Sequence, residues 1–308
     1  MKSTLDVLLY SNLFIALCAV ALTWSSYRLL GLNGPNSSLL LMVGGGTLAL
    51  YLALRLDGAK RAGSNPSVPN RLLWVQRHSM LAWTLLVAGL FFGGMGFLGV
   101  ASPVRIFLLP AAALGLAYGW PLLPLPLHWR LRRRNFLKIV LIGLVWAWVS
   151  VILPAVAAVS QLAASQSAAN QTWLPDGSPV SGIVWGVFTP AVWLLFASRF
   201  FLVLGVTLPF DIRDVEQDRI IRLETVATAF GPQRTRLLAW ICLASSCALM
   251  LGQFTPLLWL AFALPCLLAA WGISRARSDG QEYLYLGLLD GTVLLQWALV
   301  EGVVRLQG

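Results

Sequence analysis

Long apolar stretches, separated by short polar and mostly basic segments, dominate the pattern of this chain. An α-helix needs about 20 apolar residues to cross a bilayer, and nine stretches approach or exceed that length. No connecting segment is long enough for a separate soluble domain, so residues 1–308 are expected to form one all-α, integral-membrane domain. The expected helices are 7–30, 38–54, 79–100, 104–123, 136–159, 182–209, 236–252, 255–273 and 283–304.

The basic residues predict how this domain is oriented. With the N-terminus in the cytoplasm, all but four of the 22 Lys and Arg residues fall in the N-terminus or in cytoplasmic segments. This positive-inside pattern predicts nine spans with the C-terminus outside, in the inner (plasma) membrane of a bacterium. The cytoplasmic segments are 55–78, 124–138, 210–236 and 274–282, and the four exceptions are Arg28, Arg105, Arg199 and Arg305.

Composition excludes a soluble domain. Hydrophobic residues make up 58% of the chain and charged residues only 11%, whereas soluble domains have about 25% charged residues. The formal net charge of +10 is explained by cytoplasmic loops that face anionic membrane lipids. It predicts no nucleic-acid partner.

The acidic residues are concentrated in one place. Five of the 12 fall between positions 211 and 224, directly after an apolar segment. On a helix Asp211, Asp214 and Asp218 share one face, where three carboxylates repel one another unless a cation holds them. Two interpretations stay open: a divalent metal holds them, or the basic neighbours Arg213, Arg219 and Arg222 balance them. Mg²⁺ prefers oxygen ligands and commonly keeps substrate phosphates in its remaining positions, so these three residues are the predicted metal ligands.

These residues resemble the UbiA superfamily of intramembrane prenyltransferases. Asp214 and Asp218 fall on the two aspartates of the family's second motif, D-x-x-x-D, with Asp211 one turn earlier. A second match is Tyr118-Gly-Trp-Pro121 followed by Arg132 to Lys138, and a weaker one is Tyr285 with Leu289-Asp290-Gly291 in the last helix. The expected count of nine helices also agrees with this family.

The first motif of the family, N-x-x-x-D-x-x-x-D, is degenerate here. Tyr51, Arg55 and Ala59 occupy its three positions, and the nearest acidic residue, Asp57, lies on a different helix face. Two interpretations stay open. Arg55 neutralises phosphate directly, since a guanidinium binds phosphate in a bidentate manner, or the site no longer performs chemistry.

The resemblance implies a Mg²⁺-dependent transfer of an isoprenyl chain from an isoprenyl diphosphate to a lipid or aromatic acceptor. Asp214 and Asp218 are the implied catalytic carboxylates, and the site faces the cytoplasm. Arg199 and Asp290, both within apolar helices, are expected to face the interior, where they contact substrate or form an ion pair with each other. The predicted substrate-binding residues are Asn12, Arg55, Arg71, Arg132, Arg133, Lys138, Arg199 and Asp290.

Two other functions remain open at this stage. One is a non-catalytic or repurposed relative that binds an isoprenoid lipid without turnover. The other is a secondary transporter that uses Arg199 and Asp290. Two observations count against a transporter: the sequence shows no convincing internal repeat, and the expected number of helices is odd.

Overall fold

The computed structural model shows an all-helical chain and describes residues 2–32, 34–63, 69–119, 137–169, 187, 189–220, 223–278 and 282–307. Each of the nine expected ranges overlaps a helix in this part of the chain. The helices are α1 (Lys2–Tyr10), α2 (Leu13–Leu29), α3 (Ser37–Ala62), α4 (Asn70–Arg77), α5 (Ser79–Gly99), α6 (Ser102–Gly119), α7 (Leu137–Ala147), η3 (Trp148–Ile152), α8 (Leu153–Ala169), α10 (Pro190–Ile220), α11 (Val226–Phe230), α12 (Pro232–Leu249), α13 (Pro256–Ser274), η4 (Leu284–Leu289) and α14 (Asp290–Gln307).

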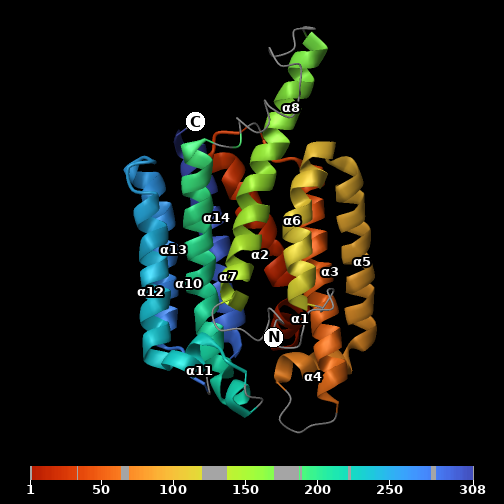
Figure 1. Ribbon diagram of the computed structural model, residues 1–308, viewed down its shortest axis with the longest axis vertical. Coiled ribbons are helices and arrows are strands. Elements are labelled where there is room, and N and C mark those ends of the chain that lie inside the picture. Colours follow the sequence, from red (N-terminus) through yellow and green to blue (C-terminus); the bar gives the residue numbers. More distant parts are fainter. Residues whose placement is uncertain are drawn as a thin grey trace.

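The long helices stand side by side in one bundle (Figure 1). Helix α10 packs against α7 and α12, and α14 packs against α2 and α13. The short helices α4 and α11 both lie at the lower end of the bundle, on opposite sides of it, and the C-terminus lies at the upper end (Figure 1). We refer to the end that carries α4 and α11 as the α4–α11 end.

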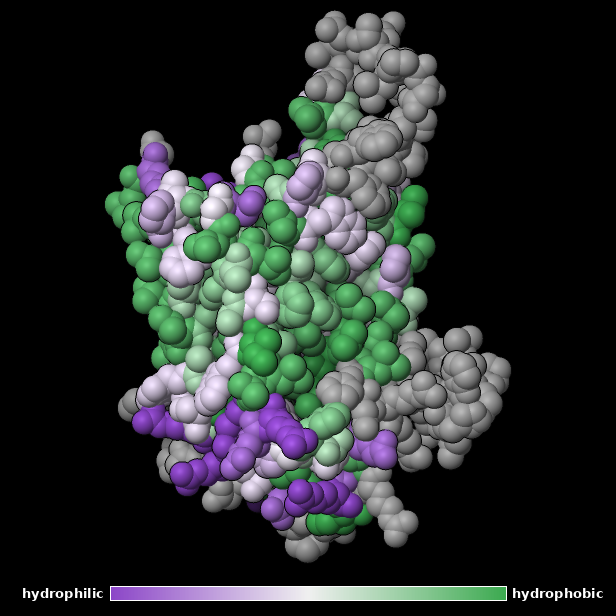
Figure 2. Space-filling view, turned by 60° about the vertical axis from the view of Figure 1, so that its left-hand side comes forward, coloured by the Kyte–Doolittle hydropathy of each residue, from purple (hydrophilic) through white to green (hydrophobic). Residues whose placement is uncertain are grey.

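The surface of the bundle matches a membrane protein. Six helices in the described part of the chain are long and apolar enough to span a bilayer, or seven if α1 and α2 form one bent span. Figure 2 shows a hydrophobic band across the middle of the molecule and hydrophilic residues gathered at its lower end. The expected all-α membrane fold is confirmed, whereas the count of nine spans and the orientation stay predictions.

The first expected helix, 7–30, is broken rather than continuous. Helices α1 and α2 meet at an angle of 62°, and Asn12 at the junction has a positive φ of 65°. Asparagine tolerates this left-handed backbone better than most residues. Because a helix end leaves carbonyl groups without an intrahelical partner, the break exposes the carbonyl of Tyr10 to another donor.

Two helices continue beyond the expected ends of their spans. Helix α3 extends to Ala62 and α10 to Ile220, so Arg55 and the acidic run both lie on helices rather than in loops. The prediction that Asp211, Asp214 and Asp218 lie on one helix is therefore correct. The continuation carries these polar side chains to the α4–α11 end on rigid elements (Figure 1).

Glycines bring α3 and α5 into close contact. A Cβ atom added to Gly45 would lie 2.7 Å from the Gly89 carbonyl oxygen and 2.8 Å from the Cα of Gly93. Such small residues let helix backbones approach each other closely within a membrane. The pairing fixes the position of α3, and therefore of Arg55.

We expect Gly45→Ala to destabilise the protein by about 1–3 kcal/mol, because the new methyl group overlaps the backbone of α5 and forces the helices apart. Thermal unfolding of the detergent-purified protein measures this effect. The matched control is Gly46→Ala, where an added Cβ meets no atom within 4 Å. Equal unfolding temperatures for the two variants would contradict the proposed close packing.

Candidate functional site

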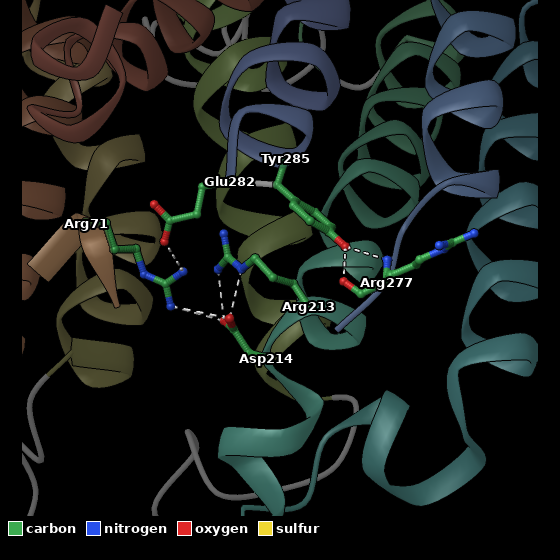
Figure 3. Close-up of polar contacts among 6 residues, drawn as sticks. All are labelled: Arg71, Arg213, Asp214, Arg277, Glu282 and Tyr285. Atoms are coloured by element: carbon green, nitrogen blue, oxygen red, sulfur yellow. Dashed lines mark hydrogen bonds and ion pairs between the residues drawn. The ribbon is translucent and has the colours of Figure 1, made fainter. Parts of the chain in front are cut away.

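A charged cluster centred on Asp214 lies at the α4–α11 end (Figure 3). Arg213 donates from Nε and Nη2 to the two carboxylate oxygens of Asp214 at 2.8 and 2.9 Å. Arg71, on α4, donates from Nη2 to the same two oxygens at 3.3 and 3.4 Å. Asp214 thus links α10 to α4 through two guanidinium groups.

Aromatic rings hold Arg213 in place. Its guanidinium carbon lies 4.9 Å from the ring centroid of Phe210 and 5.4 Å from that of Tyr285, distances typical of cation–π contacts. The Tyr285 hydroxyl donates to the carbonyl of Arg277 at 2.7 Å and accepts from the backbone N–H of Arg277 at 2.9 Å. These bonds fix the ring, as Figure 3 shows, and so orient the cation above it.

Arg71 joins a second carboxylate to the cluster. Its Nη1 lies 3.7 Å from Oε1 of Glu282, just before η4. Burial, reinforced by the nearby Arg213 cation, lowers the pKa of Arg71, while Asp214 and Glu282 oppose that shift. Arginine side chains stay protonated at neutral pH in proteins, so Arg71 supplies positive charge to the site.

Asp211 and Asp218 are both buried, with exposed fractions of 2% and 7%. The carboxylate of Asp211 accepts a hydrogen bond at 3.3 Å from the backbone N–H of Val226, the first residue of α11. Carboxylates at this position satisfy a free helix donor and interact favourably with the helix dipole. Asp211 therefore has a structural contact, and Asp218 lies one turn beyond Asp214.

We expect Asp211→Asn to keep most stability, because the amide oxygen still accepts the Val226 N–H bond. Asp211→Ala should lower the free energy of unfolding by about 1 kcal/mol, as loss of a helix cap does. Thermal unfolding of both variants, together with turnover measured at equal folded concentration, checks this. A loss of turnover in Asp211→Asn without a loss of stability would instead favour the metal-ligand interpretation.

Arg55 reaches the same region from α3. Its Nη1 donates at 2.6 Å to the Tyr10 carbonyl that the break between α1 and α2 leaves available. Arg55 lies within electrostatic range of Arg71, Arg213 and Glu282. The structure therefore brings Arg55 and Arg71 together with Asp214, as the sequence predicted.

Of the two expectations for Arg199 and Asp290, the structure does not show the ion pair between them, and substrate contact stays a prediction. Arg199 donates to Ser25 Oγ at 2.6 Å and to Gln296 Oε1, and it lies against the ring of Phe262. It precedes Asp214 by 15 positions on α10, about 22 Å at the helical rise of 1.5 Å per residue. Asp290 instead lies within electrostatic range of Arg213 and Arg55. Both side chains face the interior as expected, but only Asp290 belongs to the charged cluster.

Three predicted substrate-binding residues stay untested by this geometry. Arg132 and Arg133 lie outside the described residues, and so does the side chain of Lys138. Arg213, Glu282 and Tyr285 were not among the predicted site residues, although Arg213 was a possible partner of the acidic run and Tyr285 belongs to the weaker match in the last helix. The adjacency of Arg213 to Asp214, and the position of Glu282 just before the last helix, were the available signals for two of them.

The donor set fits a divalent metal on one side only. Asp214 and Asp218 lie four residues apart on one face of α10, which suits two carboxylate ligands. On α3 the facing residues Tyr51, Arg55 and Ala59 provide no carboxylate. Among the described residues no three His, Cys, Asp or Glu side chains are grouped to hold one ion. The predicted set of Asp211, Asp214 and Asp218 is therefore not assembled as three ligands here.

Fold and site together define a class of protein: a helical, multi-pass membrane protein with a cluster of arginines and carboxylates at one end of an apolar bundle. Residues 60–283 match the model of the UbiA prenyltransferase family. The chain belongs to this family, and the resemblance found in the sequence is confirmed.

Solved structures agree with this assignment. A UbiA homologue from Archaeoglobus fulgidus bound to GPP and Mg²⁺ is similar with a TM-score of 0.61 and 14% identity, over 97% of this chain and 99% of that one. The apo structure of a UbiA homologue from Aeropyrum pernix K1 has a TM-score of 0.57 and 17% identity, over 94% and 97%. A digeranylgeranylglyceryl phosphate synthase has a TM-score of 0.50 and 13% identity, over 99% and 100%. The search of curated proteins gave no match.

Proposed function

We propose that this protein is a membrane prenyltransferase that transfers an isoprenyl chain from an isoprenyl diphosphate to an acceptor. The observation that carries this proposal is the Asp214 cluster, which sets two arginines and several carboxylates at the end of an apolar helical bundle. A diphosphate needs the charged end and an isoprenyl tail needs the apolar interior. The UbiA homologue solved with GPP and Mg²⁺ supports the same substrate class.

Different residues of this chain are proposed to bind the diphosphate and to assist cleavage of its carbon–oxygen bond. Arg71 and Arg213 provide guanidinium groups that match phosphate geometry. As the carbon–oxygen bond of the diphosphate breaks, their charge stabilises the negative charge that develops on the leaving group. Asp290, which lies within electrostatic range of Arg213 and Arg55, is proposed to stabilise the positive charge that develops on the isoprenyl carbon.

A metal ion fits this proposal at Asp214 and Asp218. Bound Mg²⁺ supplies a Lewis acid that stabilises the leaving group's charge and orients it. The opposite side of the site, on α3, offers the Arg55 cation and no carboxylate. The proposal therefore assigns Mg²⁺ to the α10 side alone.

The acceptor is proposed only as a class: a lipid or an aromatic compound that reaches the site from the membrane. The site is proposed to face the cytoplasm of a bacterium, because the α4–α11 end carries the basic segments that the positive-inside rule places there. Family membership favours a prenyltransferase over a secondary transporter. The non-catalytic relative remains the second candidate because α3 departs from the first motif.

The test uses the full chain purified in detergent, with labelled isoprenyl diphosphates of several chain lengths, Mg²⁺ and a panel of quinone-precursor, haem, chlorin and lipid acceptors. We expect pyrophosphate release coupled to labelling of one acceptor. Tight binding of the label with no release for any acceptor would support a non-catalytic isoprenoid-binding relative. Absence of both binding and release from folded protein would refute the proposal.

A further inference from the structure

Two buried donors, one in the charged cluster and one at the break between α1 and α2, have no partner among the described residues. Arg213 Nη1 and Asn12 Nδ2 are buried atoms without a hydrogen-bond partner in the described part of the chain. The side chain of Arg213 is 9% exposed and Asn12 is 2% exposed. A buried donor without an acceptor costs free energy, and an anion would satisfy these two donors; Glu282 Oε2, also in the cluster, is a buried acceptor without a partner in the described part of the chain.

Arg55 is a cation at a position where the first motif of the UbiA family has an aspartate. Arg55 stands at the middle position of the degenerate first motif and is fixed by its bond to the Tyr10 carbonyl at 2.6 Å. Asn12 lies two residues from that carbonyl, at the break between α1 and α2. Arg55, Arg71 and Arg213 all lie within electrostatic range of one another. Helices α3, α4 and α10 thus bring the guanidinium groups of Arg55, Arg71 and Arg213 into one region.

We propose that Arg55, Arg71 and Arg213 bind the diphosphate of the substrate directly and replace the metal on the α3 side. This inference rests on the proposed function. Three guanidinium groups supply both the charge and the bidentate donors that a diphosphate requires. Diphosphate binding by this protein is therefore largely independent of divalent metal.

Two of the arginines proposed to bind the diphosphate also bind the carboxylate of Asp214. In this structure Arg213 and Arg71 both donate to its carboxylate, and the bonds from Arg71, at 3.3 and 3.4 Å, are the longer ones. An arriving phosphate competes with Asp214 for these guanidinium groups.

Equilibrium binding of a labelled isoprenyl diphosphate to the full chain, in excess EDTA and in Mg²⁺, tests this inference. We expect the wild type to bind in EDTA within roughly tenfold of its affinity in Mg²⁺. Arg55→Gln should weaken binding in EDTA by roughly 10- to 100-fold, the value of a lost charged hydrogen bond. Arg55→Asp, which restores a carboxylate to the motif position, should bind only when Mg²⁺ is present.

Two controls keep the result interpretable. Arg77→Gln removes an exposed cation from the same helix as Arg71 and should leave binding unchanged. Arg55→Lys keeps the charge and should bind better than Arg55→Gln, which separates an electrostatic role from a folding defect. Thermal unfolding of each variant confirms that it is folded.

The outcomes separate this inference from the proposed function. If the wild type turns over substrate in Mg²⁺ but does not bind it in EDTA, and if Arg55→Gln behaves like the wild type, the inference is wrong and the proposed function stands. If folded wild type neither binds nor turns over the diphosphate under any condition, both are wrong. Binding in EDTA that depends on Arg55 supports the inference even without turnover.

Discussion

Asp214→Asn should lower the rate of isoprenyl transfer by about 10²- to 10³-fold, the range seen when one preorganised electrostatic group is removed from an active site. The substitution removes the charge of the carboxylate that Arg71 and Arg213 share at the centre of the cluster. It also weakens the only D-x-x-x-D carboxylate pair in the described chain. Pyrophosphate release under saturating substrate and Mg²⁺ measures this effect.

The matched control for Asp214→Asn is Glu216→Gln. Glu216 lies two residues further along α10 and is exposed, so its charge is solvated and remote from the cluster. We expect it to retain activity within about twofold, because surface substitutions away from such features change little. Equal losses in the two variants would argue that total charge at this end of the bundle, rather than the carboxylate of Asp214, controls the rate.

Arg71→Glu should both destabilise the protein and abolish measurable diphosphate binding. Arg71 is the cation that links Asp214 on α10 with Glu282 before η4, and its side chain is 18% exposed. Reversing its charge places three carboxylates together without that cation. Breaking a buried ion pair from one side costs about 3–5 kcal/mol, and partial exposure puts the expected loss toward the lower limit of that range. Chemical unfolding in detergent measures the loss of stability.

A charge swap checks that Arg71→Glu acts through the ion pair. Adding Glu282→Arg to the variant restores one opposite-charge contact and should recover part of the lost stability. Arg77→Glu, at an exposed position on α4, should leave the unfolding free energy within about 0.5 kcal/mol of the wild type. Wild-type stability and binding in Arg71→Glu itself would show that the Asp214 cluster does not hold α4 to α10.

The sequence alone determined the class of fold and the family. Spans of about 20 apolar residues have one stable backbone solution in lipid, because every N–H and C=O must be satisfied within the segment. Each expected apolar range therefore overlaps a helix of the structure. The spacing of Asp214 and Asp218 is also local, since residues four apart share a helix face whatever the rest of the chain does.

Only the tertiary structure decided which charges meet. Arg199 and Asp290 are both ionisable residues in apolar helices, and the sequence offered them as partners. Packing instead surrounds Arg199 with Ser25 and Gln296 and leaves Asp290 near Arg213 and Arg55. The rotation and depth of each helix depend on contacts between helices that are distant in sequence, and hydropathy carries no information about them.

The break between α1 and α2 is a second feature that the sequence pattern did not predict. Asn12 was predicted to line the pocket, but its positive φ and the 62° bend follow from the surrounding packing. That bend frees the Tyr10 carbonyl, which then positions Arg55. The sequence thus determined the helices, the basic ends and the aspartate pair, and the fold decided that the substituted first motif points a guanidinium at the site. The physical reason is that apolar length and residue spacing act within one helix, whereas ion pairing in a membrane interior is set by how several helices pack.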